Sequence, residues 1–180
     1  MKRADLEHIL RASKGATGEA EFIIVGSQSI LGRHPDAPRV LRHSMELDIY
    51  PRQRPDLSPE IEGSLGRYSQ FDTTFGYHAD GVGPETATLP AGWEQRLVRV
   101  CNDNTGGATG WCLDPHDLAC AKLAARREKD VQFVTNLLRH KLVRVSQIEE
   151  LIASATDAAL RKKLTEAWLI CRSRAAEGAA

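Results

Sequence analysis

Runs of apolar residues predict strands in the first two thirds of the chain. Residues 21–25 (EFIIV) form a continuous, β-branched apolar run, which is typical of a strand buried on both faces. In residues 44–50 (SMELDIY) apolar and polar residues alternate, which predicts a strand with one buried and one polar face. We predict further short strands in residues 76–86, on both sides of a glycine turn, and in residues 89–101 and 111–113.

Helical periodicity predicts helices between these strands and throughout the last third of the chain. The pattern over residues 114–140 fits either two helices or one long one. The polar residues that we expect to begin the helices are Asp5, Ser27 or a near neighbour, Ser58, Asp114, Ser146 and Asp157.

This order of elements predicts an α/β (α+β) fold, with a small mixed β-sheet flanked by helices and a helical C-terminal part. With 180 residues, the chain is long enough for one substantial core. We place the α/β core in residues 1–113 and the helical part in residues 114–180, and we expect the two to pack together as one structural unit.

Composition and charge narrow the class of protein. The 24 Lys and Arg residues balance the 24 Asp and Glu residues, which argues against a non-specific coat for nucleic acid. The sequence lacks an apolar run of the ~20 residues that span a bilayer, and its beginning lacks the apolar core of a signal peptide. We therefore expect a cytoplasmic globular protein that does not bind membranes. The four cysteines have no metal-binding spacing and are expected to be reduced.

Charge is less evenly spread in residues 122–144, which contain seven basic and two acidic residues. This segment predicts either a patch for phosphate groups or an ordinary solvated helix face.

Two acidic residues share the polar face of the strand at residues 44–50. Successive side chains of a strand point to opposite faces, so the Cβ atoms of Glu46 and Asp48 lie ~7 Å apart on one face. This spacing lets two carboxylates reach one hard cation or bridge a pair of Mg²⁺ ions. A solvent-facing edge strand would show the same residues, so the pair alone leaves both interpretations open.

A second candidate motif follows the buried strand at residues 21–25. Gly26 and Ser27 come between this strand and a predicted helix, where backbone N–H groups and the helix dipole favour a phosphate. The alternative is an ordinary strand-to-helix turn with a serine cap. Together with Glu46 and Asp48, the motif predicts the two halves of a metal–triphosphate site for attack on a phosphoryl group.

The ordered motifs FIIVGS, SMELDIY and CLDPHDLACAKLAARREKDVQFV resemble the nucleotidyltransferase (polymerase-β-type) superfamily, in particular its bacterial AbiEii/MenT toxin-like branch. The resemblance covers roughly residues 20–140. It implies that Gly26 and Ser27 hold the nucleotide phosphates, and that Glu46 and Asp48 bind Mg²⁺. It also implies a third metal-binding carboxylate on a neighbouring strand, for which we prefer Asp80 to Glu85.

The same resemblance implies that Lys122 contacts the triphosphate and that Asp130 completes the catalytic cluster with Glu46 and Asp48. The alternatives are a lysine whose stem lies along an amphipathic helix, and an aspartate that caps the next helix. On one straight helix the two residues would be ~80° and ~12 Å apart. They can serve one site only if the helix breaks near residues 126–129, where the sequence contains no glycine or proline, or if they contact different ends of a long substrate.

The resemblance implies a Mg²⁺-dependent enzyme that transfers a nucleoside monophosphate from an NTP to a hydroxyl group. The acceptor would be RNA, such as a tRNA 3′ end, or a protein side chain, and the protein would be the toxin of a toxin–antitoxin pair. The family more often has aspartate at the position of Glu46. A catalytically degenerate protein that serves as a binding or partner subunit is therefore the alternative.

Overall fold

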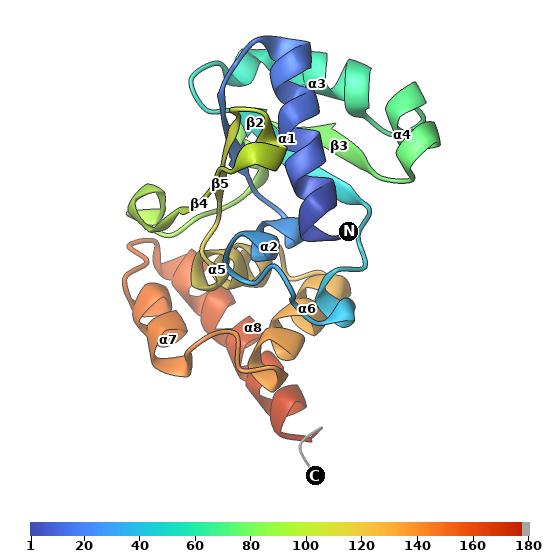
Figure 1. Ribbon diagram of the computed structural model, residues 1–180. Coiled ribbons are helices and arrows are strands. Elements are labelled where there is room, and N and C mark those ends of the chain that lie inside the picture. Colours follow the sequence, from blue (N-terminus) through green and yellow to red (C-terminus); the bar gives the residue numbers. More distant parts are fainter. Residues whose placement is uncertain (178–180) are drawn as a thin grey trace. The chain divides into compact units, whose positions relative to one another are not determined.

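The computed structural model describes residues 1–177 (Figure 1). The chain forms two compact units, one comprising Met1–Ala87 with Leu97–Asp114 and the other Thr88–Arg96 with Pro115–Ala180. The first contains a five-stranded mixed sheet and helices, and the second is helical over its described residues. The fold class predicted from the sequence is confirmed. The predicted division at residues 113/114 stays a prediction.

The sheet of the first unit has the strand order β3-β2-β1-β5-β4. β1 runs antiparallel to β2 and parallel to β5, β2 runs parallel to β3, and β4 runs antiparallel to β5. β1 is therefore the central strand, which explains its continuous apolar sequence. The strands are β1 Glu21–Ile24, β2 Glu46–Pro51, β3 His78–Gly81, β4 Val98–Val100 and β5 Thr109–Cys112.

Four α-helices belong to the described part of the first unit. They are α1 Arg3–Thr17, α2 Ile30–Arg33, α3 Ser58–Leu65 and α4 Gln70–Phe75. α1 packs on the sheet, where Gly110 leaves room because a Cβ there would lie 2.8 Å from Leu10 and 2.9 Å from Ile24. α3 approaches β3 just as closely, since a Cβ at Gly81 would lie 2.1 Å from the carbonyl oxygen of Ser58. α1 and α3 thus cover the apolar face of the sheet.

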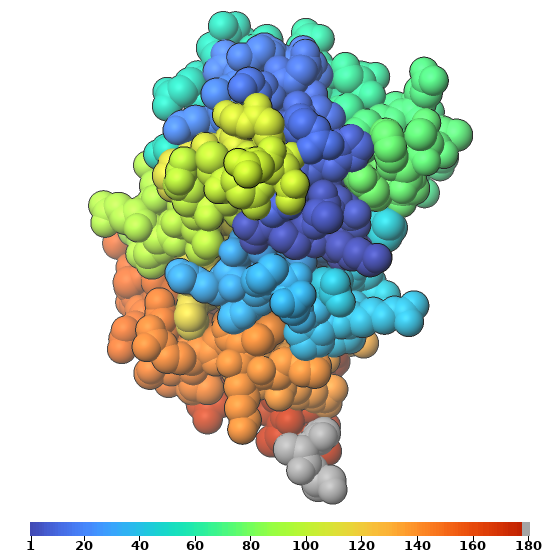
Figure 2. Space-filling model, in the orientation of Figure 1, coloured from blue at the N-terminus to red at the C-terminus, as the bar shows by residue number. Residues whose placement is uncertain are grey.

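The loop between β4 and β5 packs against α1, where Figure 2 shows its yellow-green residues beside the blue helix. Asn102 and Asn104 donate hydrogen bonds of 2.8 and 3.1 Å to the carboxylate of Glu7. Burial alone would raise the pKa of Glu7, but these two bonds and one from Arg3 outweigh burial and lower it. The buried carboxylate therefore fixes the loop to the helix.

The second unit contains α5 Pro115–Ala125, α6 Glu128–Arg139, α7 Val145–Ala153 and α8 Ala158–Glu177. The region from residue 114 to 140 thus forms two helices, which settles the choice that the sequence left open. The predicted cap at Asp157 is confirmed, because its Oδ1 accepts a hydrogen bond of 2.9 Å from the Ala159 N–H. Within residues 1–177, none of the helices combines the length and apolar character that a membrane-spanning segment requires.

Three of the predicted helix caps are wrong. Asp5 lies in the first turn of α1 and accepts a 2.6 Å bond from the Lys2 N–H, so Lys2 is the N-cap. Ser58 lies inside α3 and donates its hydroxyl to the Val82 carbonyl at 2.7 Å. Ser146 lies inside α7, which begins after Arg144. In each case the helix extends further towards the N-terminus than the polar residue indicated.

The predicted second strand after the glycine turn at residues 76–86 is also wrong. Pro84–Thr86 form a short 3₁₀ helix instead. Pro84 cannot donate a backbone hydrogen bond to a neighbouring strand, which disfavours its inclusion in a sheet. In residues 89–101 only Val98–Val100 form a strand, because Trp93–Arg96 are a 3₁₀ helix.

Candidate functional site

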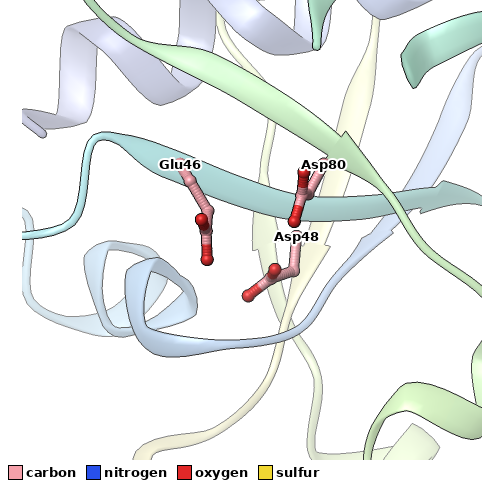
Figure 3. A group of neighbouring side chains, drawn as sticks. All are labelled: Glu46, Asp48 and Asp80. Atoms are coloured by element: carbon pink, nitrogen blue, oxygen red, sulfur yellow. The ribbon is translucent and has the colours of Figure 1, made fainter. Parts of the chain in front are cut away.

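Three carboxylates from two neighbouring strands come together on one face of the sheet. Glu46 and Asp48 belong to β2, and Asp80 belongs to β3, directly opposite Asp48 in the parallel register. Carboxylate oxygens of the three residues all lie within 4.8 Å of one another, and Figure 3 shows the side chains gathered at one place. All three residues are half-buried. We call them the carboxylate group.

The alternating sequence of β2 places these acids. Leu47 and Ile49 are fully buried, so the residues between them must point to the other face of the strand. The structure thus places Glu46 and Asp48 as the alternation predicts. The other candidate for the third carboxylate, Glu85, lies on the exposed Pro84–Thr86 turn outside the carboxylate group.

Gly26 brings the backbone after β1 into contact with Asp48. Its φ of 66° lies in the left-handed region, and a Cβ at this position would lie 1.5 Å from Asp48 Oδ2. Only glycine combines this conformation with so close an approach. Ser29 stabilises the turn, because its N–H and hydroxyl donate hydrogen bonds of 3.3 and 2.8 Å to the Gly26 carbonyl.

Ser27 begins the 3₁₀ helix Ser27–Ser29, which leads directly into α2. The residue is half-buried, and Ser29 supplies the bonds to the Gly26 carbonyl. The structure therefore places both Gly26 and Ser27 in the turn beside the carboxylate group.

The chemistry of this site suits a hard divalent cation. Three ionised carboxylates at such short distances repel one another, and a bound cation removes that repulsion. Oxygen ligands are those that Mg²⁺ prefers. The turn at Gly26 brings backbone next to the carboxylate group. The three oxygen donors therefore fit a divalent cation.

Lys122 and Asp130 meet within the second unit. Their Nζ and Oδ1 atoms are 3.2 Å apart, and the Asp130 side chain is fully buried. The chain can bring them together because Arg126, between α5 and α6, has a positive φ of 57° and ends the first helix. The helix break that lets Lys122 and Asp130 meet is therefore present, although neither glycine nor proline produces it.

Asp130 lies in the first turn of α6, whose N-cap is Arg127, so the alternative that Asp130 itself is the N-cap is wrong. Its Oδ2 accepts hydrogen bonds from the backbone N–H and the Nε of Arg127, at 3.2 and 2.7 Å. Burial alone would raise the pKa of Asp130, but the Arg127 hydrogen bonds and the charge of Lys122 outweigh burial and lower it. Lys122 Nζ in turn lies 5.6 Å from the centre of the Phe133 ring. Asp130 thus completes the capping box at the start of α6 and also pairs with Lys122.

Sequence reasoning missed His78, which neighbours Glu46 in the β2–β3 register, and its partner Asp72. His78 lies directly opposite Glu46 in the β2–β3 register, and its Nδ1 is 3.2 Å from Asp72 Oδ1. The order His78-Ala79-Asp80 in a predicted strand was the available signal, because residues two apart share a face. Nothing in the sequence linked Asp72 to this strand.

Comparison with protein families matches residues 4–169 to the family described as "Nucleotidyltransferase of unknown function (DUF6036)". The chain belongs to this nucleotidyltransferase family. Searches of curated proteins and of solved structures found no match. The narrower AbiEii/MenT toxin-like branch stays a prediction.

Proposed function

We propose that the protein is a Mg²⁺-dependent nucleotidyltransferase that transfers a nucleoside monophosphate from an NTP to a hydroxyl group. The observation that carries this proposal is the carboxylate group, whose oxygens lie within 4.8 Å of one another beside the Gly26 turn. Membership of a nucleotidyltransferase family supports it. In the reaction the hydroxyl group loses its proton to water as its oxygen bonds to the α-phosphorus, the bond between the α-phosphorus and the oxygen bridging to the β-phosphate breaks, and pyrophosphate leaves.

The roles of the residues follow from their chemistry. Glu46, Asp48 and Asp80 hold the cation, which when bound offsets the negative charge of the phosphates. The backbone at Gly26 and Ser27 lies against the nucleotide phosphates.

The resemblance extends the proposal to two residues of the second unit. Lys122 contacts the triphosphate. Asp130 holds the Lys122 ammonium group by their ion pair and so keeps its charge in place.

The resemblance to the toxin-like branch also suggests the acceptor. We propose RNA, such as a tRNA 3′ end, or a protein side chain as the acceptor, and an antitoxin as a partner. The alternative is a catalytically degenerate protein that binds nucleotide as a partner subunit. Glutamate at position 46 favours this alternative, because its longer side chain shifts a bound metal relative to aspartate.

Labelling with α-³²P-NTPs tests the proposed nucleotidyltransferase activity. Purified protein is incubated with each NTP, Mg²⁺, and either total tRNA or cell lysate. Wild-type protein should label an RNA or protein acceptor, and Asp48→Asn should reduce the rate about 100-fold or more because it removes a cation ligand. The matched control is Asp56→Asn, since Asp56 is an exposed aspartate of the same unit that pairs with Arg54 at 2.8 Å.

The outcomes separate the two proposals. Labelling that Asp48→Asn leaves unchanged would contradict the proposed active site. Mg²⁺-dependent NTP binding by the wild type without labelling of any acceptor would favour the degenerate alternative. Absence of both binding and labelling would contradict each of them.

A further inference from the structure

The exposed large apolar side chains of the first unit, among the described residues, all lie in the two segments that enter β2 and β3. They are Val40 and Met45 before β2, and Tyr68 and Phe75 before β3. β2 and β3 are parallel and begin side by side, because Glu46 lies opposite His78 and the His78 N–H donates a 2.9 Å hydrogen bond to the Met45 carbonyl. Both segments therefore lead to the end of the sheet where the carboxylate group begins.

Tyr68 is the most exposed of these residues, and its backbone is strained. The residue is 82% exposed, and its φ of 68° lies in the left-handed region, which bulky residues rarely adopt. The Arg67 guanidinium carbon lies 5.1 Å from the centre of the Tyr68 ring. Strained backbone of this kind costs energy and clusters at functional sites. The strain thus indicates a use for this exposed ring.

Two hydrogen bonds connect Tyr68 to the strand that carries Asp80. The Tyr68 N–H donates a 2.9 Å bond to Asp72 Oδ2, and Asp72 Oδ1 lies 3.2 Å from His78 Nδ1. The His78 side chain leaves β3 on the same face as Asp80, because residues two apart in a strand share a face. Tyr68 therefore lies beside β3, at the edge of the face that carries the carboxylate group.

The same two segments are basic, although the first unit has fifteen acidic against eleven basic residues. Residues 39–45 contain two arginines and no acid, and residues 67–77 contain one arginine and one acid. Arg42 forms no salt bridge with any residue of the described range 1–177. The covalent chain keeps its Cα within about 14 Å of the Cα of Glu46, since four residues span at most this distance.

We propose that the Tyr68 ring stacks on an unpaired base of a single-stranded RNA acceptor, and that Arg42 and Arg67 contact its phosphates. We call these three residues the RNA-binding surface. The proposal rests on the nucleotidyltransferase activity proposed above and selects RNA, not a protein side chain, as the acceptor. The surface holds the RNA within a few nucleotides of the carboxylate group.

The chemistry of the surface favours RNA over a protein partner. Proteins that bind single-stranded RNA stack its bases on aromatic rings and on arginine guanidinium groups, and basic residues follow its phosphates. Protein interfaces instead bury their aromatic residues in an apolar core. A single exposed ring that is stacked with one arginine, in basic segments of an acidic unit, fits the first class.

Fluorescence anisotropy of a labelled RNA tests this role in the full chain without NTP. The probes are a short single-stranded RNA of mixed sequence and the same RNA in a duplex. Tyr68→Gly should raise the Kd for the single strand about tenfold, the usual effect of losing one stacked base, and should leave the Kd for the duplex unchanged. Tyr68→Phe keeps the ring and should retain affinity within about twofold of wild type.

Tyr68→Gly also separates binding from folding. Glycine adopts a φ of 68° without strain, so this variant should melt no lower than the wild type. Its affinity for Mn²⁺, titrated by the EPR signal of the free ion, should equal that of the wild type, because the carboxylate group is untouched. A weaker Mn²⁺ affinity in Tyr68→Gly would show that Tyr68 supports the cation site, and would overturn the proposal.

Salt dependence tests the charged part of the surface. Arg42→Gln removes a phosphate contact, so the slope of log Ka against log salt concentration should become shallower by about 0.7. Tyr68→Gly should keep the wild-type slope. The matched control is Arg54→Gln, since Arg54 follows the opposite end of β2 and pairs with Asp56 at 2.8 Å. This control should bind RNA as the wild type does.

Unchanged affinity of Tyr68→Gly for the single strand, or no RNA binding by the wild type, would overturn the proposal. Labelling of a protein acceptor that Tyr68→Gly reduces, with RNA binding unchanged, would assign the surface to a protein and would also overturn it. If Asp48→Asn abolishes labelling while Tyr68→Gly changes neither labelling nor RNA binding, the activity stands and the role of Tyr68 is wrong. If Tyr68→Gly weakens RNA binding but the wild type labels no acceptor, the RNA-binding surface stands and the proposed activity is wrong.

Discussion

At the scale of single residues, the site depends on the side chain that is missing at position 26. Gly26 combines a φ of 66° with a backbone position at which a Cβ would lie 1.5 Å from Asp48 Oδ2. Any larger residue would have to move either the turn or the carboxylate. The position thus links the conformation of the turn to the geometry of the carboxylate group.

Gly26→Ala should therefore weaken both stability and cation binding. The matched control is Gly18→Ala, because Gly18 has a similar φ of 76° and no atom within 4 Å of its Cβ position. Gly18→Ala should lower the free energy of unfolding only by the cost of the left-handed conformation, about 1–2 kcal/mol. Gly26→Ala should lower the free energy of unfolding by more than this and should also raise the Mn²⁺ Kd. Urea unfolding and EPR titration measure the two effects, and equal losses with unchanged Kd would contradict this account.

Some of these residues could be predicted and others could not. Alternation in residues 44–50 was enough to place Glu46 and Asp48 on one face, because the strand period is two residues. The pairing of His78 with Asp72 could not be found in this way, since it joins a strand to the preceding helix. Its buried, unpartnered Nε2 becomes visible only when the packing around it is known.

At the scale of elements, the break between α5 and α6 is the feature that positions charge in the second unit. Arg126 adopts a left-handed conformation that non-glycine residues seldom take. Arg127 is then the N-cap of α6, and Asp130 accepts a hydrogen bond from the Arg127 backbone N–H. The sequence could not predict this break from glycine or proline. Local hydrogen bonds and the buried Lys122–Asp130 pair stabilise it instead.

Asp130→Asn should destabilise the fold by about 3 kcal/mol, because it leaves Lys122, whose side chain is only 11% exposed, without its counter-charge. The lowered pKa of Asp130 also predicts a pH dependence. Its ionised form stabilises the fold above the ordinary aspartate pKa of 3.8, and this contribution is lost as the pH falls through the lower pKa of the folded state. Urea unfolding between pH 7 and pH 3 should show a smaller pH effect in the variant.

A double variant provides the control for this pair. Lys122→Met combined with Asp130→Leu removes both charges. This double variant should lose less free energy of unfolding than Asp130→Asn alone, since no buried charge is left unpaired. A double variant that is as unstable as the sum of its single variants would show that the pair does not contribute as proposed.

At the scale of the whole molecule, the zero net charge conceals an uneven division. The first unit has eleven Lys and Arg residues against fifteen Asp and Glu residues, and the second has thirteen against nine. The carboxylate group thus belongs to a unit of net charge −4. An NTP is itself strongly negative, so the proposed nucleotide site should need a cation to bind it.

Removal of divalent cations should accordingly weaken NTP binding. With EDTA in place of Mg²⁺, the Kd for ATP in a calorimetric titration should rise about tenfold or more, equivalent to about 1.4 kcal/mol. Asp48→Asn should bind ATP equally weakly in Mg²⁺ and in EDTA. ATP affinity that EDTA leaves unchanged in the wild type would contradict a metal-dependent nucleotide site.

The fold class could be predicted from the sequence because most segments clearly show either the two-residue period of strands or the 3.6-residue period of helices. The assignment of residues 88–96 to the helical unit could not be predicted from the sequence. Arg96 in that segment forms two hydrogen bonds, of 2.9 and 2.7 Å, to the fully buried carboxylate of Asp117 on α5. An ion pair between residues 21 positions apart leaves no periodic pattern in the sequence.

The central claim is that Glu46, Asp48 and Asp80 bind a divalent cation next to the nucleotide phosphates. Anomalous diffraction from crystals grown with Mn²⁺ and a non-hydrolysable NTP analogue tests it most directly. The account predicts an anomalous peak within about 2.5 Å of oxygens from these carboxylates, with the analogue's phosphates beside the Gly26 turn. A bound analogue without Mn²⁺ at these residues, or Mn²⁺ at a different group of residues, would contradict it.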